Sequence, residues 1–175
     1  MIYGKKIRLR HAERADLPHF VRWLNTPETR QYLDAIYPFA MVEEEQWFEG
    51  LLKDREHYLN FFVIESIETG EPVGNLGLHV IDQRNRWTEL GIMIGDTSNQ
   101  NKGYGTDALR TLLRFAFETM NLNRVQLRVH NDNLRGIHVY ERCGFVREGT
   151  LRQNLWENGR YHDTHIMAVL RSEWK

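Results

Sequence analysis

Gln100-Asn101-Lys102-Gly103-Tyr104-Gly105 is the stretch that decides the fold class of this 175-residue sequence. It follows an apolar run from Trp87 to Ile94 and leads into a run whose leucines recur at helical spacing, up to Asn121. Glycine lets the backbone approach a ligand closely, and the first amides of a helix have no acceptor within that helix. The stretch therefore predicts an anion-binding turn between a strand and a helix.

Two nucleotide-binding patterns compete for this turn. The GxxxxGK[ST] string of phosphate-binding NTPase loops occurs nowhere in the sequence, which excludes that class. A dinucleotide pattern, GxGxxA, does occur at Gly103, Gly105 and Ala108. However, polar residues 96–102 separate it from the preceding strand, and Asp132 lies well beyond the roughly 20 residues at which the ribose-binding acid is expected. A dinucleotide-binding oxidoreductase is therefore the lower-ranked alternative.

The remaining elements predict one mixed sheet. In chain order they are strand 5–10, a helix capped by Asp16, a short helix from Thr26, helix 42–56, strands 60–67, 73–81 and 87–94, the helix to Asn121, strand 124–130, helix 133–142, and strands 145–155 and 161–170. Asn158-Gly159 is typical of the turn between the last two strands. We expect an α/β (mixed α+β) fold in a single domain, 1–175, with a mostly antiparallel central sheet flanked by helices.

Composition excludes several functional classes. Apolar residues make up 41% and charged residues 27%, as in globular proteins. Lys and Arg number 23 against 24 Asp and Glu, so there is no general attraction to nucleic acid or to an anionic membrane. The mean hydropathy is −0.58, and no apolar run approaches the length of a membrane helix. A single cysteine, Cys143, and an opening without a signal-like apolar run predict a reducing, cytoplasmic compartment.

The charges are unevenly distributed along the chain. Up to Asn99 there are 11 basic and 16 acidic side chains, a net charge of −5, and from Gln100 there are 12 basic and 8 acidic, a net charge of +4. The acidic residues gather between Glu28 and Glu56. Two interpretations remain open, a solvated helix face and a surface that attracts a cationic substrate.

Two motifs resemble those of the GNAT superfamily of N-acetyltransferases. Gln100, Gly103 and Gly105 match the family's Q/R-x-x-G-x-G/A loop. The stretch from Asn133 to Phe145, NLRGIHVYERCGF, is similar to its N-x-x-A-x-x-x-Y-x-K-x-G-F segment, with Gly and Arg where Ala and Lys are common. The likeness covers nearly the whole chain and is greatest to the branch with ribosomal-protein alanine and spermidine acetyltransferases.

This resemblance implies an enzyme, an acyltransferase that moves the acetyl group of acetyl-CoA directly to a primary amine in a ternary complex. It also implies a splayed pair of strands, 87–94 and 124–130, that receives the pantetheine arm. A non-catalytic CoA-binding sensor is the alternative within the same family. The residues expected to contact the donor are Ile92, Met93, Ile94, Gln100, Asn101, Lys102, Gly103, Tyr104, Gly105, Thr106, Asn133 and Tyr140.

Two residues are expected to carry the chemistry. The resemblance places Tyr140 as the general acid that protonates the leaving thiolate, and the competing interpretation is a packed core aromatic. Glu89 lies among apolar residues of a strand and either relays the proton of the amine, binds a cationic substrate, or forms an ion pair with an arginine such as Arg128.

No metal site is expected, because residues three apart in a strand, such as His162 and His165, face opposite sides. The acceptor amine stays open between a small molecule and a protein N-terminus. The hairpin from Trp156 to Tyr161 is a candidate edge for a homodimer.

Overall fold

A computed structural model describes residues 1–33 and 37–174 of the chain. The backbone divides into two compact units. Unit 1 comprises Met1–Leu78 and Ile92–Thr111, and unit 2 comprises His79–Gly91 and the chain from Leu112 onward. Three elements continue from one unit into the other along the chain, namely β4 (Pro72–Asp82), β5 (Trp87–Ile94) and α5 (Tyr104–Arg114).

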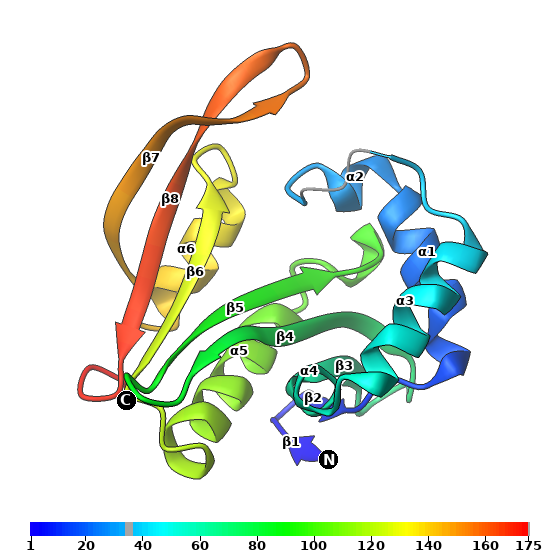
Figure 1. The fold of residues 1–175 in the computed structure, drawn as a ribbon, viewed down its shortest axis with the longest axis horizontal. Helices are drawn as coiled ribbons and strands as arrows, with labels where there is room; N and C mark the ends of the chain where they lie inside the picture. Colours follow the sequence, from blue (N-terminus) through cyan, green and yellow to red (C-terminus); the bar gives the residue numbers. More distant parts are fainter. Residues whose placement is uncertain (34–36, 175) are drawn as a thin grey trace. The chain divides into compact units, whose positions relative to one another are not determined.

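Unit 1 contains an antiparallel set of strands with helices (Figure 1). Its strands β1 (Ile2–Tyr3), β2 (Ile7–Arg10), β3 (Phe61–Ser66) and the first part of β4 lie in this order, with Leu9 opposite Ile64. In β2, Ile7 and Leu9 are buried and alternate with Arg8 and Arg10, the pattern of a strand with one apolar face. The helical elements are η1 (Arg14–Asp16), α1 (Leu17–Asn25), α2 (Pro27–Arg30), α3 (Met41–Lys53), α4 (Arg55–Asn60) and η2 (Thr97–Asn99).

The core of unit 1 is built where α1 and α3 pack together. Burial at a helical spacing of three to four residues turns one face of each helix inward. From α1 these residues are Leu17, Phe20 and Trp23, and from α3 Phe48 and Leu51, which join Ala12, Val63 and Met93.

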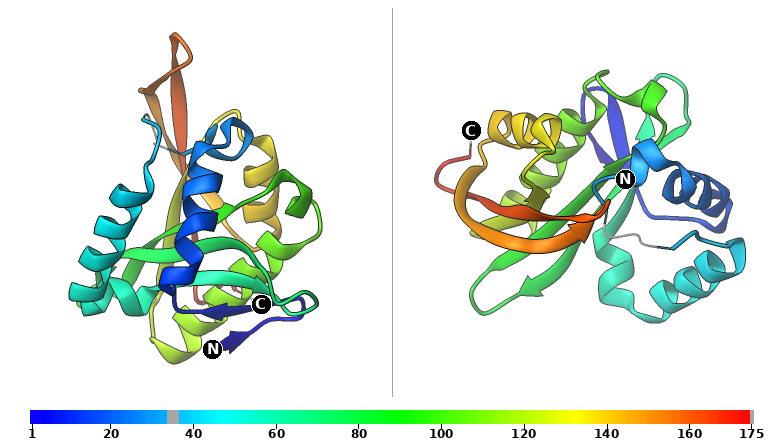
Figure 2. Two further views of the ribbon diagram at one scale, coloured as in Figure 1. Left: turned by 90° about the vertical axis from the view of Figure 1, so that its right-hand side faces the viewer. Right: turned by 90° about the horizontal axis from the view of Figure 1, so that it is seen from above.

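Unit 2 is dominated by a long antiparallel hairpin of β7 (Val146–Glu157) and β8 (Arg160–Leu170). Asn158 and Gly159 have φ angles of 49° and 78°, the left-handed values expected for an Asn-Gly turn. β8 also pairs with β6 (Arg124–His130), and the hairpin extends beyond the end of β6 (Figure 2). The remaining helical elements are a π-helical turn, η3 (Phe115–Thr119), and α6 (Leu134–Arg142).

Over residues 1–33 and 37–174, hydrogen-bonded neighbours follow the order β1-β2-β3-β4-β5-β6-β8-β7 in an eight-stranded sheet. β5 and β6 are its parallel neighbours. Their ladder within unit 2 runs from Trp87 opposite Arg124 to Glu89 opposite Gln126, although the strands have eight and seven residues. The mostly antiparallel mixed α/β fold predicted from the sequence is confirmed.

The structure corrects several predicted boundaries. The single helix expected over 42–56 is two helices, because the backbone leaves helical geometry at Asp54, whose carboxylate accepts a hydrogen bond from the His57 amide at 3.1 Å. The helix expected to reach Asn121 is α-helical only to Arg114 and continues as the π-helical turn. β1 was not anticipated, because two residues are too short for a periodic pattern.

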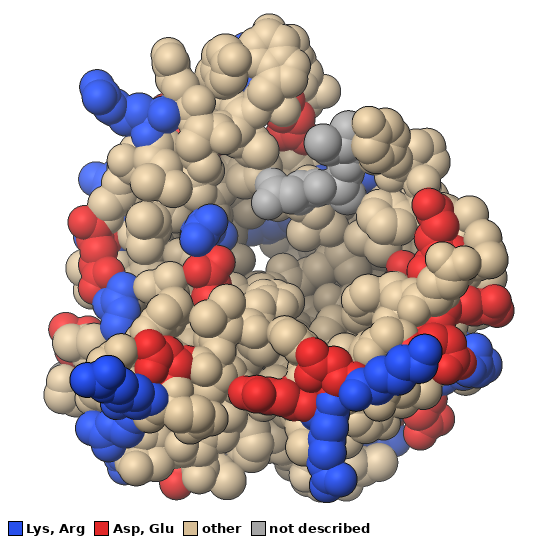
Figure 3. All heavy atoms as spheres, in the orientation of Figure 1, with Lys and Arg blue, Asp and Glu red and all other residues tan. Residues whose placement is uncertain are grey.

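Charged side chains of both signs are interspersed on the face drawn in Figure 3. No single-sign surface dominates it, as expected for a chain with a net charge of −1. Among the described residues, no helix combines the length and the apolar character needed to cross a bilayer.

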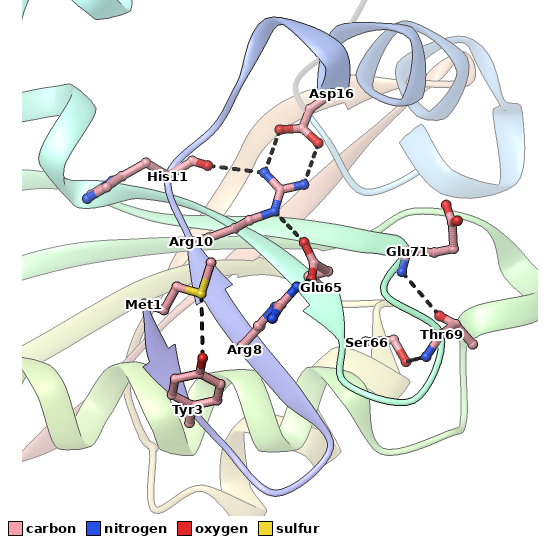
Figure 4. Close-up of polar contacts among 10 residues, drawn as sticks. All are labelled: Met1, Tyr3, Arg8, Arg10, His11, Asp16, Glu65, Ser66, Thr69 and Glu71. Atoms are coloured by element: carbon pink, nitrogen blue, oxygen red, sulfur yellow. Dashed lines mark hydrogen bonds and ion pairs between the residues drawn. The ribbon is translucent and has the colours of Figure 1, made fainter.

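β2 is fixed to its neighbours by a buried ionic network (Figure 4). The Arg10 guanidinium binds both carboxylate oxygens of Asp16, at 2.8 and 2.7 Å, and donates a further hydrogen bond to Glu65. Arg8 forms an ion pair with the same Glu65. Asp16 was expected to cap α1, but its side chain instead accepts hydrogen bonds from Arg10 and from the Glu13 amide. Residues 5–10 are thereby held in one position in unit 1.

Candidate acetyl-donor and catalytic sites

The predicted anion-binding turn lies in unit 1, between β5 and α5. Asn101 and Gly103 both have left-handed backbone conformations, with φ of 60° and 85°. The Asp107 amide donates to the Gly103 carbonyl at 3.0 Å, which makes Gly103 the residue at which the helix begins. The positive φ is the physical reason for glycine at 103, because a side chain is strained in this conformation.

The space around the turn suits a phosphate ligand. A Cβ atom added to Gly103 would meet only the Lys6 ammonium, at 3.5 Å, and one added to Gly105 would meet only the Ile94 side chain, at 3.5 Å. Each added Cβ atom would therefore make ordinary van der Waals contact with one neighbouring side chain, so the protein does not crowd this surface at either glycine. The first amides of α5, at Tyr104 and Gly105, have no acceptor within the helix, and the positive end of the helix dipole favours an anion there. These features fit the pyrophosphate of acetyl-CoA.

Ile92, Met93 and Ile94 form the last part of β5, which belongs to unit 1. Gly74 of β4 lies so close to the Met93 carbonyl that a Cβ atom at position 74 would overlap it. Trp23 covers Gly95 just beyond the strand, and Gly95 donates through its amide to the Val73 carbonyl at 2.9 Å. The backbone at the end of β5 is therefore closely packed against β4 and Trp23.

Tyr140 lies on α6 in unit 2 and is half-buried. Its ring contacts Phe145 edge to face, with the ring centres 5.9 Å apart. Burial raises the pKa of the Tyr140 phenol to about 12, and the nearby Cys143 thiol adds to this shift. The phenol is therefore protonated throughout the neutral range, as a proton donor must be. Cys143 is a buried thiol at the end of the helix.

Asn133 caps the start of α6. Its side-chain oxygen accepts a hydrogen bond from the Gly136 amide at 2.9 Å. A Cβ atom at position 136 would come within 2.7 Å of the Asn133 side-chain nitrogen. This close approach explains why glycine, rather than the alanine common in the resembled segment, suits this cap.

Glu89 of β5 has two partners on the neighbouring β6, all in unit 2. Its carboxylate accepts a hydrogen bond from the Gln126 amide group at 2.9 Å and lies 3.4 Å from the Arg128 guanidinium. The side chain is 22% exposed, so water and small solutes reach it. The ion pair with Arg128, one of the sequence interpretations, is therefore formed.

Two polar clusters had no sequence signal. In unit 2, the buried His162 side chain contacts Asp132 at 3.0 Å. In unit 1, the Asp107 carboxylate contacts the backbone of residues 5–7. Both clusters join residues far apart in sequence, which neither periodicity nor local spacing indicates. Among the described residues, no group of three or more His, Cys, Asp or Glu side chains is arranged to hold a metal ion.

Comparison with known proteins identifies the family of the chain. Residues 6–146 match the acetyltransferase (GNAT) domain family. The chain is 30% identical over 172 residues to the spermidine N(1)-acetyltransferase of Vibrio cholerae, covering 98% of this chain and 96% of that protein. It is 37% identical over 130 residues to the putative ribosomal N-acetyltransferase YdaF of Bacillus subtilis, covering 73% and 70%.

A solved structure has the same fold. The crystal structure of the spermidine N-acetyltransferase from Vibrio cholerae, in complex with CoA and spermine, superimposes with a TM-score of 0.87 at 29% identity, over 97% of this chain and 98% of that one. The dinucleotide alternative gains no support from any of these similarities. The chain belongs to the GNAT acetyltransferase family and is an acetyl-CoA-dependent N-acetyltransferase of amines.

Proposed function

We propose that this protein acetylates a small, cationic primary amine of the polyamine class by direct transfer from acetyl-CoA. The observation that carries the proposal is the open glycine turn at the start of α5, in a chain matched almost end to end by a spermidine N(1)-acetyltransferase. The net charge of −5 up to Asn99 supports a cationic acceptor.

The chain offers backbone groups for the donor. Residues 100–106 would hold the pyrophosphate through amides and the helix end, and the backbone at Ile92, Met93 and Ile94 would hold the pantetheine arm. Asn133 would offer its side-chain amide group to the pantetheine arm, while its oxygen caps α6. When bound, acetyl-CoA supplies an activated acyl group and a thiolate that must be protonated as it leaves.

We propose that Tyr140 donates the proton that the leaving thiolate takes up. Its Oη holds a proton at neutral pH, because burial raises the pKa to about 12. A donor of this kind typically accelerates a reaction by roughly 10² to 10⁴.

For Glu89 we propose that its partly exposed carboxylate accepts the proton of the amine through water. Glu89→Gln should then lower kcat while Arg128→Gln leaves it nearly intact. Equal effects of the two substitutions on kcat and stability would instead support a purely structural ion pair.

The experiment that tests the function is an acceptor panel with acetyl-CoA. It compares spermidine and spermine with a peptide carrying a free N-terminus, and it follows both thiol release and product mass. We expect acetylated polyamine and no acetylated peptide. Peptide acetylation without polyamine acetylation would assign the protein N-terminus as the acceptor, and CoA binding without turnover of any amine would support the sensor alternative.

A further inference from the structure

The start of the chain is attached to the first turn of α5. The Asp107 carboxylate accepts hydrogen bonds from three consecutive backbone amides, those of Lys5 at 3.2 Å, Lys6 at 2.7 Å and Ile7 at 3.2 Å. All of these residues belong to unit 1. Asp107 thus places the Lys6 side chain next to the turn that precedes the helix.

Lys6 binds this turn directly. Its ammonium donates a hydrogen bond to the Lys102 carbonyl oxygen at 2.9 Å, and it is the group that a Cβ atom on Gly103 would meet, at 3.5 Å. An amine bonded to this carbonyl determines which way the peptide group between Lys102 and Gly103 faces.

The orientation of that peptide group matters because the C=O and N–H of a trans peptide point in opposite directions. The chain has no cis peptide bond among its described residues. With the Lys102 carbonyl held by Lys6, the Gly103 N–H must face away from Lys6. Glycine populates positive and negative φ about equally, so the residue that permits the turn also permits its peptide group to flip.

We propose that Lys6 is a positioning residue for the acetyl donor, which selects the peptide orientation that offers the Gly103 N–H to the donor phosphates. The inference rests on the proposed function of the turn as the pyrophosphate site. Lys6 acts through the Lys102 carbonyl, and its charge adds a local attraction for anions. The bend that precedes β2 is thereby part of the proposed donor site, although it lies almost a hundred residues from the motif.

The test compares two donors, acetyl-CoA and S-acetylpantetheine, which lacks the phosphates. Lys6→Met keeps an unbranched side chain of similar length and removes its charge and hydrogen bonds, while Lys6→Arg restores a donor. Lys5→Met is the matched control, because Lys5 contacts Asp107 through a backbone amide that the substitution retains. Calorimetry gives the Kd of acetyl-CoA, and steady-state kinetics give kcat and KM with each donor.

For Lys6→Met we expect the Kd and KM of acetyl-CoA to rise about five- to tenfold, the size of one lost contact with a charged group near water, with kcat within about twofold. We expect kcat/KM for S-acetylpantetheine and the melting temperature to stay at the values of the control. Lys6→Arg should recover most of the affinity.

The outcomes separate this inference from the proposed function. If the wild-type protein fails to bind acetyl-CoA, the proposed function is overturned and the role of Lys6 with it. If the wild type binds and Lys6→Met binds equally well, only the role of Lys6 is overturned. Equal losses with both donors, or a lower melting temperature than in the control, would mean that Lys6 is merely structural.

Discussion

Tyr140 is the single residue on which the proposed chemistry depends most. Tyr140→Phe removes one hydroxyl and keeps the ring that packs on Phe145, so folding and acetyl-CoA affinity should be retained. We expect kcat to fall by roughly 10² to 10⁴ if departure of the thiolate limits the rate. Steady-state kinetics and the melting temperature check this together, and a destabilised variant with full kcat would support the packed-aromatic interpretation.

The pH profile provides the control for this substitution. Because burial raises the pKa of Tyr140 to about 12, its deprotonation cannot lower kcat between pH 7 and about pH 10. Any decline due to Tyr140 should begin only as the pH approaches that pKa, and it should be missing in Tyr140→Phe. A limb near pH 8 or 9 that survives in the variant belongs to another group.

Glu44 is a buried carboxylate on α3, and desolvation raises its pKa above the ordinary value. The native state then binds this proton more readily than the unfolded state, so stability falls as pH rises from the unfolded pKa through the folded pKa. We expect Glu44→Gln to raise the free energy of unfolding at pH 7, because the amide carries no charge to desolvate. Denaturant unfolding at pH 7 and pH 4 measures this, with the exposed Glu45→Gln as control, and an equal gain at both pH values would contradict it.

At the scale of elements, the turn before α5 depends on the backbone at Gly103. Acetyl-CoA should raise the melting temperature, because a ligand that binds only the native state stabilises it. Gly103→Val should remove most of that shift, since φ of 85° strains a branched side chain and the added methyls occupy the open surface. Thermal unfolding with and without acetyl-CoA gives the result, and an unchanged shift would contradict the assignment of the turn.

The ionic network of β2, β3 and η1 makes a second prediction at this scale. Arg10→Met leaves the carboxylates of Asp16 and Glu65 buried, with exposures of only 4% and 5%, and without their shared partner. The expected loss is roughly 3–5 kcal/mol in the free energy of unfolding. Arg14→Met, which breaks the exposed pair with Glu49, should cost at most about 1 kcal/mol. Urea titrations of both variants measure the difference, and similar losses would contradict a special role for burial.

Sequence patterns predicted the bounds of helices and strands better than they predicted which side chains contact one another. The bounds of β5 and β6, 87–94 and 124–130, follow from apolar patterns that are local. The break at Asp54 was missed because an acidic residue among other acidic residues has the same pattern as a solvated helix. Asp16 is the N-cap residue of α1 as predicted, but its side chain makes no capping hydrogen bond, because it accepts from Arg10 and from the Glu13 amide.

The candidate sites likewise combine residues that sequence patterns predict with contacts that they do not predict. The glycine motif and the position of Tyr140 came from residue patterns and family resemblance. The arginine partner of Glu89 was one of the interpretations, because a neighbouring strand supplies few candidates. The contact of Lys6 with Lys102 joins the bend before β2 to the turn before α5, and no local sequence pattern predicts that pairing.

At the scale of the whole molecule, the unequal charge of the two halves of the sequence predicts that electrostatic attraction guides a cationic acceptor to the protein. If the acidic residues up to Asn99 attract a cationic amine, raising salt from about 0.05 to 0.5 M should increase the acceptor KM several-fold and change kcat much less. Kinetics at saturating acetyl-CoA measure this. A neutral acceptor analogue provides the control, and a salt-independent KM would mean that the acidic residues are simply solvated.

The contact between Asp107 and the amides of residues 5–7 has a consequence for synthesis. The two sides are about 100 residues apart in the chain, so at roughly 5–20 residues per second the first side leaves the ribosome about 5–20 s before the second. During this interval the amides of residues 5–7 can donate hydrogen bonds only to water or to a neighbouring strand. This contact therefore forms only after Asp107 has been synthesised, and it closes a long loop at an entropic cost that contacts between near neighbours in the chain do not carry.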